Sequence, residues 1–364
     1  MTELEKAREK IDDTDRKLLD LIAERMQIAK EVAAYKIRHG LPVLDEVREQ
    51  QVLQSRTAAA AQRGLPDGIR DVFRAVMRMS RQYQRDLVTQ EPLQSRRAAF
   101  QGVPGANSHM ALMELLGENM ESMPCETFEE VFRAVESGQA AYGILPIENS
   151  FAGSVAQVYD LLAVFEVFII AEKRLRIDHM LLGLPGARFE DIETVFSHEQ
   201  ALAQCSDFFR AHPHIAQRPY YNTAGAAKFV SEQRNIHFAA LANSFAAQLY
   251  DLQILEESVN SSRANTTRFI LISSRPYAGS DANKAAVTFR LAHQPGALAE
   301  VLTHFAAHGL NMVKIESRPL RDRNFEYSFY IDFEGMEVRP KLEKAIQEGS
   351  LLFSDIRILG VYRK

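Results

Sequence analysis

Charged side chains occupy positions of the N-terminal sequence where a helix would bury apolar ones. Arg25 lies between Leu21 and Ile28 in a 3–4 repeat of mainly apolar residues, and Lys36 follows about three turns later on the same helix face. A buried cation is costly unless an anion meets it. The pattern therefore predicts either an internal ion pair or a pocket for an anionic ligand.

Two further segments supply polar groups that fit such a pocket. Asp45, Arg48 and Glu49 lie at positions i, i+3 and i+4, and Ser80 and Gln84 at i and i+4. An exposed ladder of ion pairs is an alternative for the first group, and back-bonding to its own helix is an alternative for Ser80. Several cations with one carboxylate and one amide fit a small dianion that carries a hydroxyl group.

Small polar residues follow predicted strands in the middle of the chain. The motifs lie at Gly102–Ser108, Pro146–Ser150, Ser197–Gln200 and Asn222–Gly225. Helix N-termini gathered at the carboxyl edge of a sheet form an anion-binding crevice. Each motif alone is more often only a helix cap, so the predicted crevice depends on their occurring together.

The elements that must position the N-terminal groups are helices. Residues 1–90 predict helices over 4–38, 44–63 and 67–88, separated by glycine and proline. The first helix is too long for its own domain to cover, so we expect an intertwined homodimer, or a higher oligomer, in which two long helices cover each other. The seam of that helix comprises Leu4, Ala7, Ile11, Thr14, Leu18, Leu21, Arg25, Ile28, Val32 and Tyr35.

Two changes of texture divide the rest of the chain. After a polar linker at 91–97, alternating strands and helices predict an α/β domain over 98–274, with a mostly parallel sheet and two lobes. After a second break at 275–284, residues 285–364 have the βαββαβ order of a ferredoxin-like fold. Strands of the α/β domain are expected over 97–101, 140–145, 166–170, 194–196, 218–221, 237–241 and 268–272.

The composition excludes several classes of protein. The 364 residues are 46% hydrophobic and 25% charged, with a net charge of −5, which is typical of globular proteins and argues against nucleic acid as a partner. Neither a secretory signal nor an apolar run of membrane-spanning length occurs, so we expect a cytoplasmic protein with no membrane partner. Cys125 and Cys205 lack metal-ligand spacing, and we expect no metal and no cofactor.

Residues 1–90 resemble the all-helical chorismate mutase family. The matching positions are Arg8, Glu24, Arg25, Lys36, Asp45, Arg48, Glu49, Ser80 and Gln84. The resemblance implies a site filled from both chains, to which the partner subunit contributes Arg8. It also implies that Glu49 binds the ring hydroxyl of chorismate, while Asp45 and Ser80 complete the wall.

The remaining positions have roles implied by the same family. Arg8, Arg25 and Arg48 would hold the two substrate carboxylates, and Lys36 and Gln84 would hydrogen-bond the ether oxygen. A Claisen rearrangement needs no nucleophile and no proton transfer. Preorganised cations and an amide therefore suit it, because they select the compact conformer and stabilise charge on the breaking C–O bond.

The middle block resembles the prephenate dehydratase family, whose two-lobed fold is similar to that of periplasmic binding proteins. The resemblance covers about 98–274 and rests on Asn265-Thr-Thr267-Arg268-Phe269, Pro146-Ile-Glu148-Asn149-Ser150, Ser197-His with Gln204-Cys, and Thr223-Ala. The glycine loop departs from it, because Asn107 stands where many members have an aromatic residue.

Roles in prephenate dehydration follow from this resemblance. Thr267 would donate a hydrogen bond to the leaving hydroxyl, with Arg268 near a carboxylate. The residues that would position prephenate are Glu148, Asn149, Ser197, Gln204 and Thr223. Without the resemblance, Thr267 is a β-branched residue entering a strand.

The last block resembles the ACT regulatory domain. Its markers are Pro295-Gly296-Ala297-Leu298 at the first helix and Glu316-Ser317-Arg318-Pro319 on the second strand. In related dehydratases these segments bind phenylalanine between paired domains, which implies phenylalanine as an effector here. A dimerisation module is the alternative.

Together these resemblances predict a bifunctional enzyme that converts chorismate to prephenate and prephenate to phenylpyruvate. A ligand-sensing protein with a helical dimeriser and binding-protein-like lobes is an alternative. A mutase fused to a dehydrogenase is another, but the Gly-x-Gly-x-x-Gly fingerprint that it requires does not occur.

Overall fold

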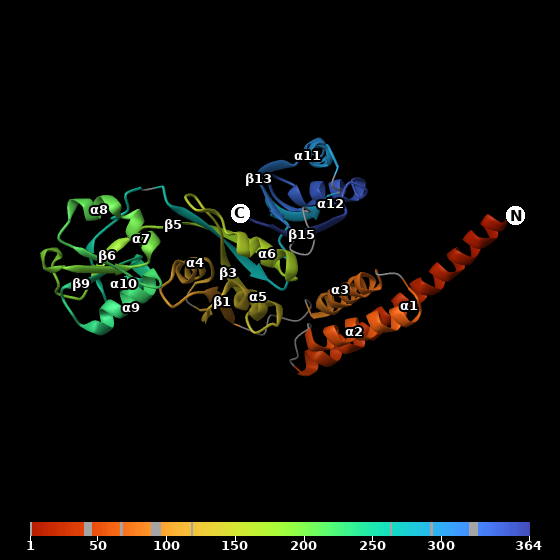
Figure 1. Ribbon diagram of the computed structural model, residues 1–364, viewed down its shortest axis with the longest axis horizontal. Helices are drawn as coiled ribbons and strands as arrows, with labels where there is room; N and C mark the ends of the chain where they lie inside the picture. Colours follow the sequence, from red (N-terminus) through yellow and green to blue (C-terminus); the bar gives the residue numbers. More distant parts are fainter. Residues whose placement is uncertain are drawn as a thin grey trace. The chain divides into compact units, whose positions relative to one another are not determined.

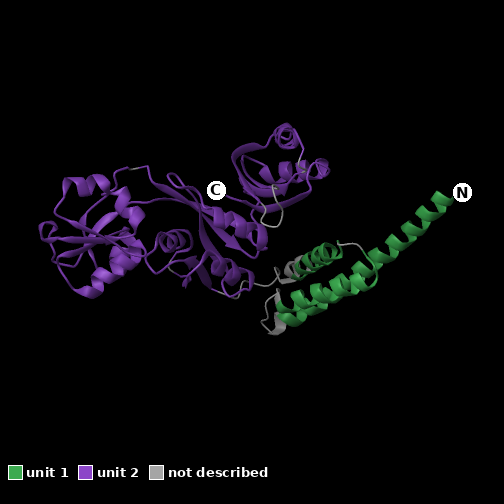
Figure 2. Ribbon diagram, in the orientation of Figure 1, with its two compact units in different colours: residues 1–94 green, residues 95–364 purple. Residues whose placement is uncertain are grey.

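The computed structural model describes residues 2–39, 46–65, 68–88, 96–117, 119–262, 264–291, 294–319 and 327–364. The chain forms two compact units, residues 1–94 and residues 95–364 (Figure 2). Among the described residues, no helix is both long enough and apolar enough to cross a membrane.

The first unit is helical, as predicted. It contains α1 (Glu3–His39), α2 (Glu46–Gln62) and α3 (Ile69–Val88), each within two residues of its predicted bounds (Figure 1). Helix α3 packs against both α1 and α2. The unit therefore brings all three segments with candidate site residues together.

The face of α1 that packs within the chain differs from the predicted seam. Met26, Ala29 and Ala33 are buried, whereas Leu21 and Ile28 remain 61% and 51% exposed. Each buried residue directly follows a seam position in the sequence. The short alanine side chains on this face allow another helix to approach closely. The large apolar side chains of the seam stay exposed in the single chain, and its coverage by a second copy stays a prediction.

The first lobe of the second unit is a mixed sheet with helices α4 (Asn107–Leu116), α5 (Phe128–Glu136) and α6 (Ala156–Val164). Its strand order is β2 (Glu121–Cys125), β1 (Arg97–Gln101), β3 (Tyr142–Asn149), β11 (Thr266–Ser273) and β5 (Phe168–Arg176), and β4 (Gly153–Ser154) pairs with β3. Strand β1 is parallel to β2 and β3, but β11 is antiparallel to both neighbours. The predicted mostly parallel sheet is therefore wrong, because β11 returns from the second lobe in the opposite direction.

The second lobe is a separate sheet. Its strand order is β10 (Gln253–Glu256), β6 (Met180–Gly183), β9 (Phe238–Ala242), β7 (Thr194–Ser197) and β8 (Ala216–Pro219). Its helices are α7 (Glu199–Gln204), α8 (Ser206–Ala211), α9 (Thr223–Gln233) and α10 (Ser244–Leu249). The chain crosses between the lobes after β5 and again before β11, so the predicted two-lobed α/β fold is confirmed.

The third domain has the predicted ferredoxin-like order. It runs β12 (Lys284–Arg290), α11 (Ala297–Ala307), β13 (Asn311–Pro319), β14 (Tyr327–Glu334), α12 (Val338–Glu348) and β15 (Asp355–Tyr362). The antiparallel sheet has the order β13-β14-β12-β15.

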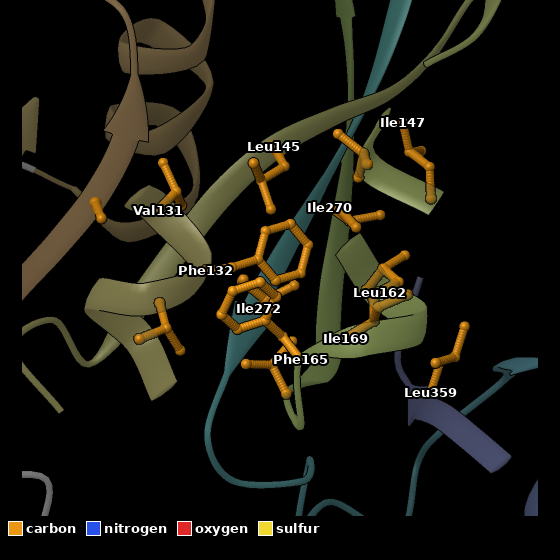
Figure 3. Close-up of a cluster of buried hydrophobic side chains, with 14 of the residues drawn as sticks. Val131, Phe132, Leu145, Ile147, Leu162, Phe165, Ile169, Ile270, Ile272 and Leu359 are labelled. Atoms are coloured by element: carbon orange, nitrogen blue, oxygen red, sulfur yellow. The ribbon is translucent and has the colours of Figure 1, made fainter. Parts of the chain in front are cut away.

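One hydrophobic core joins this domain to the first lobe. Phe132, Leu145 and Ile272 pack in a cluster that also contains Leu359 of β15 (Figure 3). Gly360 is needed for this contact, because a Cβ atom there would lie 2.1 Å from the Ile169 carbonyl oxygen of β5. The third domain is thus packed directly against the sheet of the first lobe.

Candidate active sites

The Arg25 guanidinium crosses from α1 to α3. Its Nη1 donates a hydrogen bond to Ser80 Oγ and another, at 3.3 Å, to the Val76 carbonyl oxygen. Ser80 donates to the same carbonyl oxygen at 3.0 Å, so it is back-bonded to its helix as the alternative predicted. Burial lowers the pKa of Arg25, and the Glu49 carboxylate counteracts this shift. The half-buried cation is therefore held by neutral oxygen atoms, with the Glu49 carboxylate near it.

The neighbouring polar groups lie on α2 and α3. Gln84 is buried one turn from Ser80, and its Oε1 has no hydrogen-bond partner among the described residues. Glu49 forms an ion pair with Arg81, a residue that the sequence analysis did not select. Arg81 could have been found from its place beside Ser80 on a helix that carries other site residues.

The described contacts join several members of the predicted chorismate set within one chain. Arg25, Glu49 and Ser80 converge from α1, α2 and α3, and Gln84 is buried one turn from Ser80 on α3. Lys36 is half-buried farther along α1, whereas Arg8 and Arg48 are exposed in the single chain. Asp45 lies outside the described residues.

A chain of side-chain amides surrounds Thr267 in the second unit. Asn149 Nδ2 donates to Thr267 Oγ1 at 3.0 Å and to Asn265 Oδ1 at 2.8 Å. Asn265 Nδ2 in turn donates to Gln204 Oε1 at 3.1 Å. The Thr267 oxygen is thus an acceptor from Asn149, which leaves its own proton available for donation.

Arg268 and Glu148 lie on the opposite face of the sheet from Thr267, contrary to expectation. In the β3–β11 ladder Thr267 pairs with Asn149, and Arg268 pairs with Glu148. Successive side chains of a strand point to opposite faces, so these two pairs diverge. Arg268 is buried and contacts Glu148 at 3.2 Å, Glu172 at 3.2 Å and Asp332 at 2.6 Å.

These ion pairs belong to a larger group, here called the rear charge cluster. Its members are Glu148, Glu172, Arg268, Lys284, Lys314 and Asp332. Lys284 Nζ lies 2.7 Å from Glu172, and Lys314 Nζ lies 2.8 Å from Glu148. Burial opposes ionisation of the two glutamates, but the neighbouring cations outweigh it and lower the pKa of each carboxyl group. The cluster therefore links the third domain to the back of the strands that carry Thr267 and Asn149.

Ser197 forms a hydrogen bond within the second lobe, and its predicted contact with prephenate stays a prediction. Its side chain is fully buried, and its Oγ donates to the Leu241 carbonyl oxygen at 2.7 Å. Thr223 begins α9 and is half-buried, and the neighbouring Asn222 accepts from Gly225 N as the helix cap.

The glycine loop contacts the second lobe through a residue that the sequence analysis missed. Asn243 Nδ2 donates to Gly105 O at 3.0 Å and to Asn107 Oδ1 at 2.7 Å. Asn243 follows β9 and caps α10, so it has the strand-to-helix position of the other polar motifs. Asn107, where the chain departs from the dehydratase family, takes part in this contact between lobes.

The predicted effector residues fall into two groups. Gly296 precedes α11 with φ of 85°, and Ala297 and Leu298 are half-buried at the start of that helix. On β13, Glu316 accepts from Ser154 at 2.6 Å and Arg318 pairs with Asp160 at 3.0 Å, while Ser317 is exposed. Glu316 and Arg318, two of the predicted effector-binding residues, therefore contact the first lobe of the same chain.

Three family models match the chain in sequence. They are Chorismate mutase type II over residues 7–85, Prephenate dehydratase over 98–277 and ACT domain over 285–348. Each match falls on one of the three structural blocks described above.

Relatives match over the whole chain or over its second unit. A Bifunctional chorismate mutase/prephenate dehydratase of Escherichia coli (strain K12) is 34% identical over 98% of this chain and 95% of that protein. A solved Prephenate dehydratase in complex with L-Phe from Arthrobacter aurescens is 30% identical, covers 74% of this chain and 90% of its own, and has a TM-score of 0.66.

A further solved structure is described as a novel type of quorum quenching acylase. It is 36% identical, covers 73% of this chain and 97% of its own, and has a TM-score of 0.66. It covers 73% of this chain, whereas the Escherichia coli relative covers 98% of it. The Escherichia coli relative is similar to this chain across all three matched domains. The chain therefore belongs to the family of bifunctional chorismate mutase/prephenate dehydratases.

Proposed function

We propose that the helical unit converts chorismate to prephenate and that the two-lobed domain converts prephenate to phenylpyruvate. The observation that carries the second step is the hydrogen bond from Asn149 Nδ2 to Thr267 Oγ1 at 3.0 Å. It orients the threonine hydroxyl as a donor, which is what departure of the ring hydroxyl of prephenate requires.

The mutase pocket acts by fixed charge and shape. Arg25 supplies a half-buried cation for the substrate carboxylates, and Glu49 supplies a carboxylate for the ring hydroxyl. The buried Gln84 amide has an unsatisfied oxygen, and a half-turn of that amide would present its N–H groups to the ether oxygen instead. These groups favour the compact substrate conformer and stabilise the developing charge without taking a proton.

Completion of this pocket calls for a second copy of the chain. Leu18, Leu21 and Ile28 expose 54%, 61% and 51% of their surface along one face of α1. An apolar seam of this kind is covered when two long helices pair. We infer a homodimer, or a higher oligomer built from it, in which the partner subunit's Arg8 reaches the substrate carboxylates.

In the dehydratase step, the C–C bond to the ring carboxylate breaks and its electron pair enters the ring. The C–O bond to the ring hydroxyl breaks at the same time, so carbon dioxide and hydroxide leave, and the hydroxide takes a proton from solvent to become water. Thr267 donates a hydrogen bond to the departing oxygen, Asn149 orients the Thr267 hydroxyl, and Gln204 orients the substrate. Formation of an aromatic ring supplies driving force, so a hydroxyl donor of ordinary acidity is sufficient.

An acylase reaction is less well supported by the same geometry. Hydrolysis of an acyl group needs a nucleophile that is activated by a neighbouring base. The described partner of the Thr267 hydroxyl is an amide N–H of Asn149, which cannot accept a proton.

We further propose that phenylalanine is the effector, bound through the segments at Gly296–Leu298 and Glu316–Arg318. The phenylalanine complex of the Arthrobacter aurescens dehydratase supports this proposal. We place the enzyme in the cytoplasm, where a reducing environment keeps the free thiols of Cys125 and Cys205 reduced.

A coupled assay tests the proposed function. Purified full-length protein is given chorismate, and prephenate and phenylpyruvate are measured over time. We expect both products in sequence, with prephenate preceding phenylpyruvate. Consumption of neither chorismate nor added prephenate would contradict the proposal.

A further inference from the structure

The orientation of the Asn149 side-chain amide is fixed by the main chain. Asn149 Oδ1 accepts hydrogen bonds from Phe151 N and Ala152 N, each at 2.9 Å. Backbone nitrogens only donate, so the atom that faces them must be the amide oxygen. The opposite atom, which faces Thr267 and Asn265, is therefore the nitrogen.

The orientation of Asn149 fixes the orientations of the next two amides, those of Asn265 and Gln204. Asn265 must turn its oxygen to Asn149, so its nitrogen faces Gln204 Oε1 at 3.1 Å. His179 Nε2 lies 3.1 Å from that same Gln204 oxygen. Because Gln204 Oε1 is an acceptor in both contacts, His179 must carry a proton on Nε2.

His179 is held in the first crossing between the lobes. Its side chain is 4% exposed, and its backbone N donates to Asn260 Oδ1 at 2.6 Å, while its carbonyl oxygen accepts from Val259 N at 2.9 Å. Burial lowers the pKa of the His179 imidazole, although Gln204 and Asp178 oppose this shift. Burial therefore favours the neutral ring, and the hydrogen-bond chain places its proton on Nε2.

These contacts determine which end of the Gln204 amide is available to the substrate. With Gln204 Oε1 facing both Asn265 and His179, the amide nitrogen is left, and it has no hydrogen-bond partner among the described residues. Prephenate is a dianion, so an N–H donor attracts it. The opposite orientation of the amide would present an oxygen and repel it.

We propose that His179 is a positioning residue of the dehydratase site: its Nε2–H holds the Gln204 amide so that the N–H groups face prephenate. This inference rests on the proposed function. His179 does not touch the substrate itself; it acts through Gln204, at the end of the chain that holds the Thr267 hydroxyl.

Substitutions of His179 test the proposal with prephenate as substrate. His179→Leu keeps an apolar volume but removes the donor, and we expect kcat/KM to fall about tenfold, mostly through KM. His179→Gln restores an N–H at a similar position, and we expect activity within about threefold of wild type. His237→Leu is the matched control, because His237 lies in the same lobe and bonds the Asp191 carbonyl oxygen outside this chain of hydrogen bonds.

A second pair of variants separates positioning from a loss of folding. Gln204→Glu keeps acceptors for His179 and Asn265 but replaces the N–H groups with a carboxylate, so we expect a loss of a hundredfold or more. In a Gln204→Ala background, His179→Leu should add little further loss, because the two residues act on one interaction. Circular dichroism and the thermal transition of residues 95–364 in each preparation report whether the unit that carries the dehydratase site is folded.

Equal losses in His179→Leu and His179→Gln, or a full additional loss from His179→Leu in the Gln204→Ala background, would overturn the proposal. So would wild-type activity in Gln204→Glu. Failure of the wild-type enzyme to convert prephenate would instead refute the proposed function, and it is distinguished by being common to all preparations.

Discussion

Replacement of Arg268 by methionine perturbs the rear charge cluster at its centre. The Arg268 side chain is 7% exposed and contacts Glu148, Glu172 and Asp332. After its removal Lys284 Nζ still lies 2.7 Å from Glu172 but 3.9 Å from Asp332. The Asp332 carboxylate therefore loses its nearest cation. Removal of one partner from a buried ion pair typically costs about 3–5 kcal/mol. In a unit of this size that loss lowers the unfolding temperature by about 10 °C.

The assay follows both activities of the full-length chain during heating at one fixed protein concentration. Dehydratase activity of Arg268→Met should be lost at a lower temperature, whereas mutase activity should follow wild type because the helical unit is a separate compact unit. Glu121→Gln is the control, since its partnership with Arg97 on the same sheet is exposed and should leave the transition unchanged.

Prephenate binding in the same variant tests which face Arg268 occupies. Below the transition, the KM of Arg268→Met for prephenate should stay within about threefold of wild type, because the guanidinium points away from Thr267. A KM raised a hundredfold would mean that Arg268 binds a substrate carboxylate and would refute the assignment of faces.

Further predictions concern the mutase site, acid stability and the effector. Arg25→Ala should reduce chorismate turnover at least about a hundredfold and spare prephenate dehydration; loss of both activities would indicate a structural role. The lowered pKa of Glu148 and Glu172 stabilises residues 95–364 above the unfolded carboxyl pKa of about 4.3, and this contribution should be lost as pH falls through the lower folded values. Circular dichroism should then show acid unfolding of this unit that Glu148→Gln makes less steep; an unchanged slope would exclude that carboxylate. Phenylalanine should inhibit dehydration in a binding and activity titration, and an unresponsive enzyme would leave the ACT domain a structural role.

Helical periodicity and the βαββαβ order were sufficient to predict most of the architecture. The edge strand β2 was missed, because Pro124 interrupts its pattern and proline is tolerated only where one side of a strand is unpaired. The direction of β11 was also missed. Nothing in a strand's own residues encodes whether the chain enters it from the near or the far lobe.

Local motifs predicted the candidate site less completely than the fold. Thr267 and Arg268 are adjacent in sequence, and the resemblance placed both at the substrate, but strand alternation sends them to opposite faces. This alternation could have been applied to Thr267 and Arg268 as soon as the strand had been predicted. His179 and Asn243 were not selected, because their roles depend on contacts between segments far apart in the chain.

The most direct measurement gives chorismate to the Thr267→Ala variant and follows chorismate, prephenate and phenylpyruvate together. We predict that chorismate disappears at the wild-type rate and that prephenate accumulates without phenylpyruvate, because the two sites are separate and Thr267 provides the donor to the leaving hydroxyl. Phenylpyruvate formed at the wild-type rate would contradict the role of Thr267, and unconsumed chorismate would contradict the separation of the two sites.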